Sequence, residues 1–313
     1  MGQGDSILVE SGGHYLLVDA GENDQAATVT DYLSNQGVTR LDYVIGTHPH
    51  SDHIGGLDAV ISEFEVGKVI LPPVEHTTRT FEDVLDAVAD KGLKMTKPVP
   101  GDSYTLGDAS FTIIAPNGDY GDDLNNWSVG ILLENGANRF VMCGDAEAKA
   151  EADIAGNGMD ISADVLKVGH HGSRTSTSNE FLDRVNPSTA VIQCGAGNSY
   201  GHPHKETMTK LKERKIQVFR TDQDGTIIAR SDGKNIRWET ASGRTDRQTT
   251  ETAAAKESAA ASSYYVLNTN SKKFHLPGCS SVQQISDKNK AEWDGTRDDL
   301  ISRGYAPCKQ CNP

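Results

Sequence analysis

The sequence lacks an apolar run that approaches the roughly 20 residues of a transmembrane helix. Its first ten residues, MGQGDSILVE, also lack the charged and then apolar regions of an export signal. The first absence predicts a chain with no transmembrane segment. Because the chain opens inside what looks like a strand and turn, we expect an upstream strand and any export signal to be missing from it.

Basic residues are scarce as well. The 313 residues include 30 Lys and Arg against 44 Asp and Glu, a net charge of −14. Residues 1–240 hold 20 basic and 36 acidic side chains, whereas residues 264–313 hold 7 and 5. Such an acidic main segment argues against binding nucleic acid through a broad basic surface. Any affinity for a polyanion is therefore expected in the C-terminal segment or at bound metal ions.

Strand and helix patterns alternate between residues 6 and 240, as in a layered α/β domain. In FEDVLDAVADKG, Phe81, Val84 and Val88 have helical spacing, and Gly92 stands where a left-handed cap belongs. Cys143 and Cys194 lie in apolar runs and are expected to be buried.

Large apolar residues are missing between Ala241 and Ser263, where Thr, Ala, Ser, Glu and Lys prevail. Such a segment cannot bury enough surface to offset its ordering entropy. We therefore predict a main domain over residues 1–240, a linker over 241–263 and a small unit over 264–313. The sequence gives no indication of the oligomeric state.

Four side chains of the kind that bind metal occur within six residues of the segment THPHSDH. The strand pattern DYVIGTH runs into this segment, which places His48, His50, Asp52 and His53 on one loop at the strand's carboxyl end. His48 and His50 can converge on one ion while Asp52 and His53 turn to a second. Imidazole and carboxylate ligands suit zinc, manganese or iron. The segment predicts a centre for two divalent ions, Zn²⁺ or Mn²⁺.

Later segments supply a carboxylate able to bridge two ions and a further imidazole. Asp145 follows an apolar strand in RFVMCGDAE, and His170 and His171 follow another in DVLKVGHHGS. One of these two histidines is expected to bind metal and the other to face substrate, and the sequence does not decide which. Asp19, in LLVDAG, ends a further strand and is expected to hydrogen-bond a ligand histidine.

These motifs resemble the signature of the metallo-β-lactamase superfamily, namely HxHxDH, a strand ending in Gly-Asp and a later strand ending in histidine. In addition, GQGDSILVE, LLVDAG, NNWS, CGDAE, LKVGHHGS and YGHP are similar, in this order, to the hydrolase domain of the ComEC-type competence proteins. The resemblance covers about residues 1–240. It implies an α/β fold, the αββα four-layer sandwich, with the metals at one edge between the sheets.

One departure concerns the histidine that many superfamily members carry before the Gly-Asp strand. Here that region reads LNNWSVGILL and offers Asn125, Asn126 and Ser128 instead. One ion would then have His48, His50 and a bridging Asp145, with open positions for water or substrate. Further contacts to metal ligands or to substrate are expected from four polar side chains, Asn126, Ser128, Ser173 and His202.

The resemblance implies hydrolysis of a phosphodiester in nucleic acid, with DNA favoured. Asp52 would orient a metal-activated hydroxide, and whichever of His170 and His171 is not a ligand would protonate the leaving oxygen. The alternatives are a phosphorylcholine esterase acting on cell-wall polymers, β-lactam or lactone hydrolysis, and a DNA- or surface-binding protein with a vestigial site. An extracellular or cell-surface location in a bacterium is expected, and a cytoplasmic one stays open.

The C-terminal segment carries a second set of potential ligands. His275 and Cys279 are spaced HxxxC, Cys308 and Cys311 are spaced CxxC, and a polar, helix-like stretch separates the pairs. A 50-residue unit with few apolar residues needs an additional crosslink to be stable, which one structural Zn²⁺ would supply. A disulfide among the three cysteines is the alternative. The segment resembles the small zinc-binding module related to the Ada DNA-repair protein, which implies a tail that targets nucleic acid.

Overall fold

The computed structural model describes residues 2–243, 263–276, 279–295, 300–301, 303–309 and 311. The chain divides into two compact units, Met1–Arg247 and Gln248–Pro313. Most of the predicted linker, residues 244–262, lies outside the described residues.

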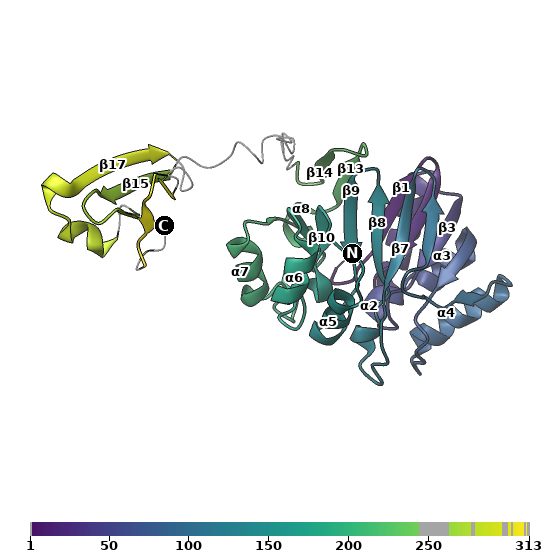
Figure 1. The fold of residues 1–313 in the computed structure, drawn as a ribbon. Coiled ribbons are helices and arrows are strands. Elements are labelled where there is room, and N and C mark those ends of the chain that lie inside the picture. The colour runs from purple at the N-terminus through teal and green to yellow at the C-terminus, as the bar shows by residue number, and fades with distance from the viewer. Residues whose placement is uncertain are drawn as a thin grey trace. The chain divides into compact units, whose positions relative to one another are not determined.

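The first unit contains two large sheets with helices on their outer faces (Figure 1). The first sheet has the strand order β1-β2-β3-β4-β5, with β2 to β5 parallel. Its strands are β1 (Ile7–Ser11), β2 (His14–Val18), β3 (Arg40–Ile45), β4 (Glu65–Ile70) and β5 (Met95–Thr96).

The second sheet has the order β12-β11-β10-β9-β8-β7-β6 and is parallel from β9 to β12. Its strands are β6 (Ser103–Leu106), β7 (Ala109–Ala115), β8 (Gly130–Asn135), β9 (Asn138–Met142), β10 (Val165–Lys167), β11 (Thr189–Ile192) and β12 (Gln217–Arg220). A separate hairpin joins β13 (Ile227–Ser231) and β14 (Ile236–Thr240).

Successive side chains of each strand point to opposite faces of its sheet, and this alternation creates the layers. Leu16 and Val18 of β2 pack with Phe111 and Ile131 of the second sheet, between the two sheets. Leu17, which lies between them in sequence, packs on the outer face among helical residues. Two apolar faces on each sheet thus produce the αββα sandwich.

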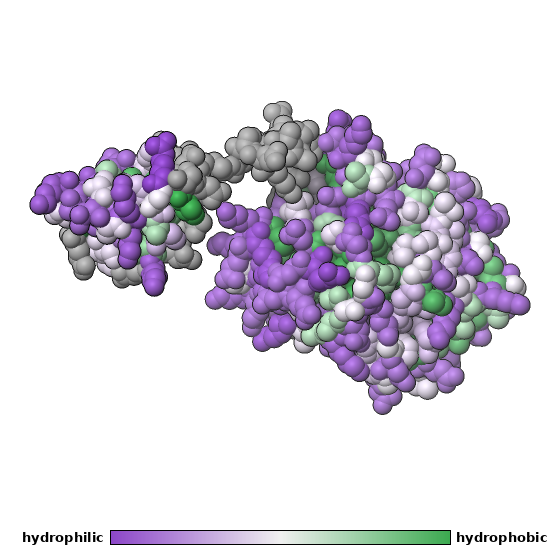
Figure 2. All heavy atoms as spheres, in the orientation of Figure 1, coloured by the Kyte–Doolittle hydropathy of each residue, from purple (hydrophilic) through white to green (hydrophobic). Residues whose placement is uncertain are grey.

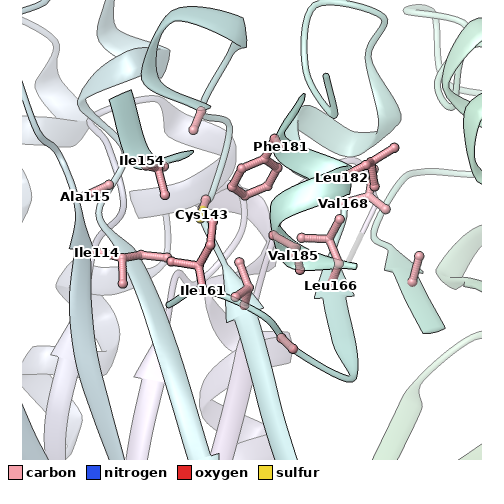
Figure 3. Close-up of a cluster of buried hydrophobic side chains, with 14 of the residues drawn as sticks. Ile114, Ala115, Cys143, Ile154, Ile161, Leu166, Val168, Phe181, Leu182 and Val185 are labelled. Atoms are coloured by element: carbon pink, nitrogen blue, oxygen red, sulfur yellow. The ribbon is translucent and has the colours of Figure 1, made fainter. Parts of the chain in front are cut away.

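The helices of the first unit cover both outer faces. They are α1 (Ala26–Asn35), α2 (Ser51–Ile54), α3 (Leu57–Glu63), α4 (Arg79–Asp90), α5 (Ala148–Gly156), α6 (Asn179–Val185), α7 (Lys205–Glu213) and α8 (Thr221–Asp224), with 3₁₀ turns η1 (Asn23–Gln25), η2 (Leu124–Trp127) and η3 (Gly169–Gly172). Figure 3 shows Phe181 and Val185 of α6 beside Leu166 and Cys143 of the second sheet's outer face. Cys143 and Cys194 are buried, as predicted.

Helix α4 covers Phe81 to Asp90 of the predicted segment and begins two residues earlier. Phe81, Val84 and Val88 are buried, and Gly92 adopts the left-handed φ of +64° that ends the helix.

The face of the first unit seen in Figure 2 is mainly hydrophilic, with scattered apolar side chains. Among the described residues, no helix has the length and apolarity of a membrane span.

The second unit is a small sheet with the order β17-β15-β16-β18. Its elements are β15 (Ser263–Asn268), β16 (Lys273–His275), η4 (Ser280–Gln284), η5 (Asp287–Asn289), β17 (Lys290–Gly295) and β18 (Ala306–Pro307). The prediction of a helix-like middle is wrong for Lys290–Gly295, which pairs antiparallel with β15. Ala291 and Trp293 face the small core at the spacing of a strand, and this contact overrides the polar composition.

Candidate metal centre

The segment THPHSDH lies at the carboxyl end of β3, between the two sheets. His48 and His53 are fully buried, whereas the Asp52 side chain is 28% exposed. His48 Nε2 lies 3.0 Å from His50 Nδ1. One ring nitrogen of His48 and one of His50 therefore lie close enough together for both to contact a single ion.

Asp145 and His171 reach the same place from the second sheet, beyond the ends of the neighbouring strands β9 and β10. His171 Nε2 lies 3.2 Å from Asp52 Oδ2 and 3.4 Å from Asp145 Oδ2, and His53 Nε2 lies 3.2 Å from Asp145 Oδ2. One ligand atom from each of Asp52, His53, Asp145 and His171 lies within 4.8 Å of all the others. We call these four residues the Asp52 cluster.

His170 occupies a different position from its neighbour. Its Nε2 is 3.8 Å from Asp145 Oδ2, its Nδ1 is 3.1 Å from Glu147 Oε1, and its side chain is 23% exposed. The backbone at both histidines is left-handed, with φ of 48° at His170 and 53° at His171. This conformation costs about 1–2 kcal/mol per non-glycine residue and turns the two side chains to different sides.

Burial and hydrogen bonding show that a divalent ion fits the Asp52 cluster. Within the described part of the chain, three buried atoms of the cluster make no hydrogen bond of suitable geometry, namely His53 Nε2, Asp145 Oδ1 and His171 Nε2, although both nitrogens lie 3.2 Å from a carboxylate oxygen. Leaving such atoms unsatisfied costs about 1–3 kcal/mol each. A cation bound among them would remove this cost, and two imidazoles with two carboxylates form a donor set for Zn²⁺ or Mn²⁺.

Asp19 orients His53 from the side remote from the cluster. Its carboxylate accepts hydrogen bonds from Thr47 N and Thr47 Oγ1, both at 2.8 Å, and lies 2.8 Å from His53 Nδ1. Burial alone would lower the pKa of His53, but the Asp145 and Asp19 carboxylates outweigh it and raise the pKa well above its usual value. Burial would likewise raise the pKa of Asp145, yet His171 and His53 hold it well below the usual range.

Sequence reasoning missed Asp5 and Lys167, which support His171. Lys167 Nζ lies 2.6 Å from Asp5 Oδ2, and Asp5 Oδ1 lies 3.3 Å from His171 Nδ1. The Asp5 backbone N–H also donates to Asp52 O at 3.0 Å. One signal was present in the sequence, because a lysine inside the apolar strand DVLKV needs a buried anionic partner.

The other predicted polar residues divide into two groups. Ser128 Oγ accepts from Asp145 N at 3.1 Å and lies 3.3 Å from His48 Nδ1, so it contacts two predicted ligands. Asn126 Oδ1 instead accepts from Glu147 N and Ala150 N, both at 3.1 Å, at the start of α5. Ser173 is buried and bonds Thr175 within its own turn.

A cleft of about 480 Å³ opens over the Asp52 cluster. Asp52, Asp145 and His171 form part of its lining, together with His50, His170, Gln3, His76, Tyr200 and His202. Burial and the neighbouring His170 lower the pKa of His202 to about 4, so this imidazole is neutral at physiological pH. The predicted ligands are thus accessible to a substrate from one side.

The second unit contains the other predicted ligand set. One ligand atom from each of His275, Cys279, Cys308 and Cys311 lies within 4.8 Å of all the others, and the described cysteines form no disulfide. His275 Nδ1 is buried without a hydrogen-bond partner among the described residues. One imidazole and three thiols in this arrangement fit a structural Zn²⁺.

Residues 1–196 match the model of the metallo-beta-lactamase superfamily. ComE operon protein 3 of Bacillus subtilis is 35% identical over 63% of this chain and 25% of its own length. Recombination protein 2 of Haemophilus influenzae is 29% identical over 72% of the chain and 27% of its own length. Competence protein ComA of Neisseria gonorrhoeae is 30% identical over 72% of the chain and 30% of its own length.

The chain thus spans between a quarter and a third of the length of these relatives. The family match covers the loop of His48 to His53, Asp145 and His171, which are the residues that the fold brings together. The chain belongs to the metallo-beta-lactamase superfamily of metallohydrolases, and it is similar to competence proteins of the ComEC type.

Proposed function

We propose that the first unit is a metal-dependent phosphodiesterase that hydrolyses nucleic acid, with DNA as the favoured substrate. The observation that carries the proposal is the Asp52 cluster, whose unsatisfied ligand atoms lie at the bottom of an open cleft. A vestigial site in a binding protein would have no reason to retain this arrangement.

In this proposal the metal ligands form two sets. His53, His171 and Asp52 would hold one ion, His48 and His50 would hold the other, and Asp145 would lie between them. Two bound divalent ions would lower the pKa of water and stabilise the charge that develops on an attacked phosphodiester.

Two residues at the cleft have further tasks in this proposal. Asp52 is the most exposed member of the cluster, and its carboxylate can accept a hydrogen bond from the attacking water and so orient it. His170 faces the cleft, where its imidazole can donate a proton to the leaving oxygen. Glu147, 3.1 Å from His170 Nδ1, would keep that imidazole in position.

The choice of nucleic acid follows from the relatives and from charge. The names of the matched relatives refer to competence and recombination, and this supports DNA as the substrate. Because residues 1–240 carry a net charge of −16, binding of a polyanion to this unit would depend on the ions in the cleft. The second unit, which a bound Zn²⁺ would stabilise, would add affinity for polymeric nucleic acid.

The test is side-by-side hydrolysis of single-stranded DNA, double-stranded DNA, RNA, a phosphorylcholine ester and bis-p-nitrophenyl phosphate, with Mn²⁺ or Zn²⁺ after removal of bound metal. We expect turnover of DNA that is lost in His50→Ala and Asp145→Ala. The surface variant His14→Ala is the matched control and should behave as wild type, because its side chain is 54% exposed. Absence of turnover on every nucleic acid with metal bound would refute the proposal, and cleavage of the phosphorylcholine ester alone would replace it.

The tail is tested separately. Removal of residues 264–313 should weaken cleavage of long DNA and spare bis-p-nitrophenyl phosphate. Equal losses on both substrates would contradict a targeting role for the second unit.

A further inference from the structure

The loop between β11 and α7 displays an aromatic ring at the cleft. Tyr200 lines the cleft together with Asp145 and His171, and it is 66% exposed. This is the largest exposed fraction among the large apolar side chains of the described residues. A single exposed aromatic residue is unremarkable elsewhere on a surface, but at the opening of a catalytic cleft its free face is available to a substrate.

Hydrogen bonds from one side chain fix the shape of this loop. Asn198 Nδ2 donates to Gly195 O at 2.8 Å and to His202 O at 2.7 Å, and Asn198 Oδ1 accepts from His202 N at 2.9 Å. These bonds join the two ends of the segment that carries Tyr200. The ring is therefore presented on a braced turn, which reduces the entropy lost when a ligand packs on it.

Gln3 ties the same loop to the N-terminal segment. Its Oε1 accepts from Gly195 N at 3.0 Å, and its Nε2 lies 3.1 Å from His202 Nδ1. Gln3 is itself buried, with 9% exposure. The loop thus has a fixed position relative to Asp5 and the Asp52 cluster.

The rings between the metal ligands and solvent are nearly parallel. The Tyr200 and His202 rings are 5.6 Å apart with planes at 20°, and the His202 and His171 rings are 6.1 Å apart with planes at 24°. His202 covers one face of Tyr200, and the high exposure of Tyr200 leaves ring surface open to solvent. A flat group stacked there would continue the series, with the rings of Tyr200 and His202 between it and the predicted metal ligand His171.

We propose that Tyr200 is the stacking platform for an unpaired nucleobase beside the scissile phosphodiester, so that the enzyme acts on single-stranded nucleic acid. The inference rests on the proposed function and specifies its substrate class. Stacking on an aromatic side chain is the usual way in which proteins hold single strands without reading their sequence. Within a duplex, neighbouring base pairs already cover both faces of each internal base, whereas an unpaired base has a free face that can lie on Tyr200.

A quaternary ammonium group, such as choline, is the competing occupant of an aromatic face. Such cations are recognised by cages of several aromatic rings. Among the described residues, the ring contact of Tyr200 is with His202 alone. One open face suits a planar heterocycle better than a spherical cation.

The test compares full-length wild type, Tyr200→Ala and Tyr200→Phe, loaded with Mn²⁺, on a single-stranded oligonucleotide and on the same strand with abasic sites. We expect Tyr200→Ala to lose about 5- to 150-fold in kcat/KM on the strand that carries bases, from the usual contribution of one stacked base. Tyr200→Phe keeps the ring and should stay near wild type, and the abasic strand should be cleaved equally by all three. Tyr32→Ala, which removes an exposed tyrosine from α1, is the matched control.

Equal rates of wild type and Tyr200→Ala on the strand with bases would overturn the inference. Fluorescence anisotropy of both labelled strands separates this failure from that of the proposed function, because binding is read without turnover. Wild type could cleave neither strand and still bind the strand with bases more tightly than the abasic strand, a preference that Tyr200→Ala would lose. That result would support the stacking site and refute the nuclease assignment. The stacking site would be refuted if wild type bound the two strands equally. It would also be refuted if phosphocholine displaced the strand with bases from wild type but not from Tyr200→Ala.

Discussion

Replacement of Lys167 by methionine should strongly destabilise the first unit. The Lys167 side chain is 4% exposed in β10, and its Nζ lies 2.6 Å from Asp5 Oδ2 and donates to Val168 O at 3.0 Å. Methionine fills a similar volume but removes the ammonium group, which leaves the Asp5 carboxylate, 2% exposed, without its nearest cation. Removal of one partner from a buried ion pair costs about 3–5 kcal/mol. A domain is typically stable by about 5–15 kcal/mol, so this loss is a large fraction.

The same substitution should change the ionisation of Asp5. Burial raises the pKa of this carboxyl, and Lys167 and His171 outweigh burial and hold the pKa below its usual value. Without Lys167 the pKa should rise, and the carboxyl should take up a proton at a higher pH than in wild type. Part of the destabilisation would then be relieved in mildly acidic solution.

The assay is urea unfolding of the metal-free full-length protein at pH 7, followed by circular dichroism. The double variant Asp5→Asn with Lys167→Met should recover much of the loss, because neither charge is then buried. The surface variant Arg230→Met, which breaks an exposed ion pair with Glu239, should leave the midpoint unchanged. A loss below about 1 kcal/mol in Lys167→Met, or no recovery in the double variant, would refute the reasoning.

Three further predictions concern other parts of the chain. Asp42→Ala should lower the free energy of unfolding at neutral pH, and this loss should shrink in acid, as urea midpoints from pH 2 to 7 will show. Burial opposes ionisation of Asp42, but the Tyr15 backbone N–H and other neighbours lower the pKa of its carboxyl. The stabilisation by the carboxylate is therefore present above about pH 4 and is lost as the pH falls through the lowered pKa. Gly4→Ala should reduce metal affinity several-fold in a competition titration, because the added Cβ would lie 2.4 Å from Asp52 O; unchanged affinity would contradict the close approach. Cys308→Ser should release zinc and weaken long-DNA binding while sparing hydrolysis of a small ester, and an unaltered zinc content would exclude this ligand.

Much of the site could be predicted because its ligands follow strands. His48 to His53, Asp145 and His171 each come after an apolar run, and the carboxyl ends of such strands meet at one edge of the sandwich. The two sheets themselves follow from the period-2 alternation of segments such as HYLLV, whose successive side chains enter different layers.

The rest depended on contacts that sequence patterns do not encode. The choice between His170 and His171 depends on left-handed backbone angles at two adjacent residues. The pairing of Asp5 with Lys167 joins residues 162 positions apart, and only the packed sheets bring them together. The strand at Lys290–Gly295 forms because β15 offers it hydrogen bonds, whereas its own composition is polar.

The division of the Asp52 cluster between the two sheets has a consequence for biosynthesis. Asp52 and His53 follow a strand of the first sheet, and Asp145 and His171 follow strands of the second, so a growing polypeptide lacks part of the cluster until residue 171 has left the ribosome. An incomplete or misfolded chain would therefore lack the full set of metal ligands. The cluster is complete only when both sheets have formed and packed together.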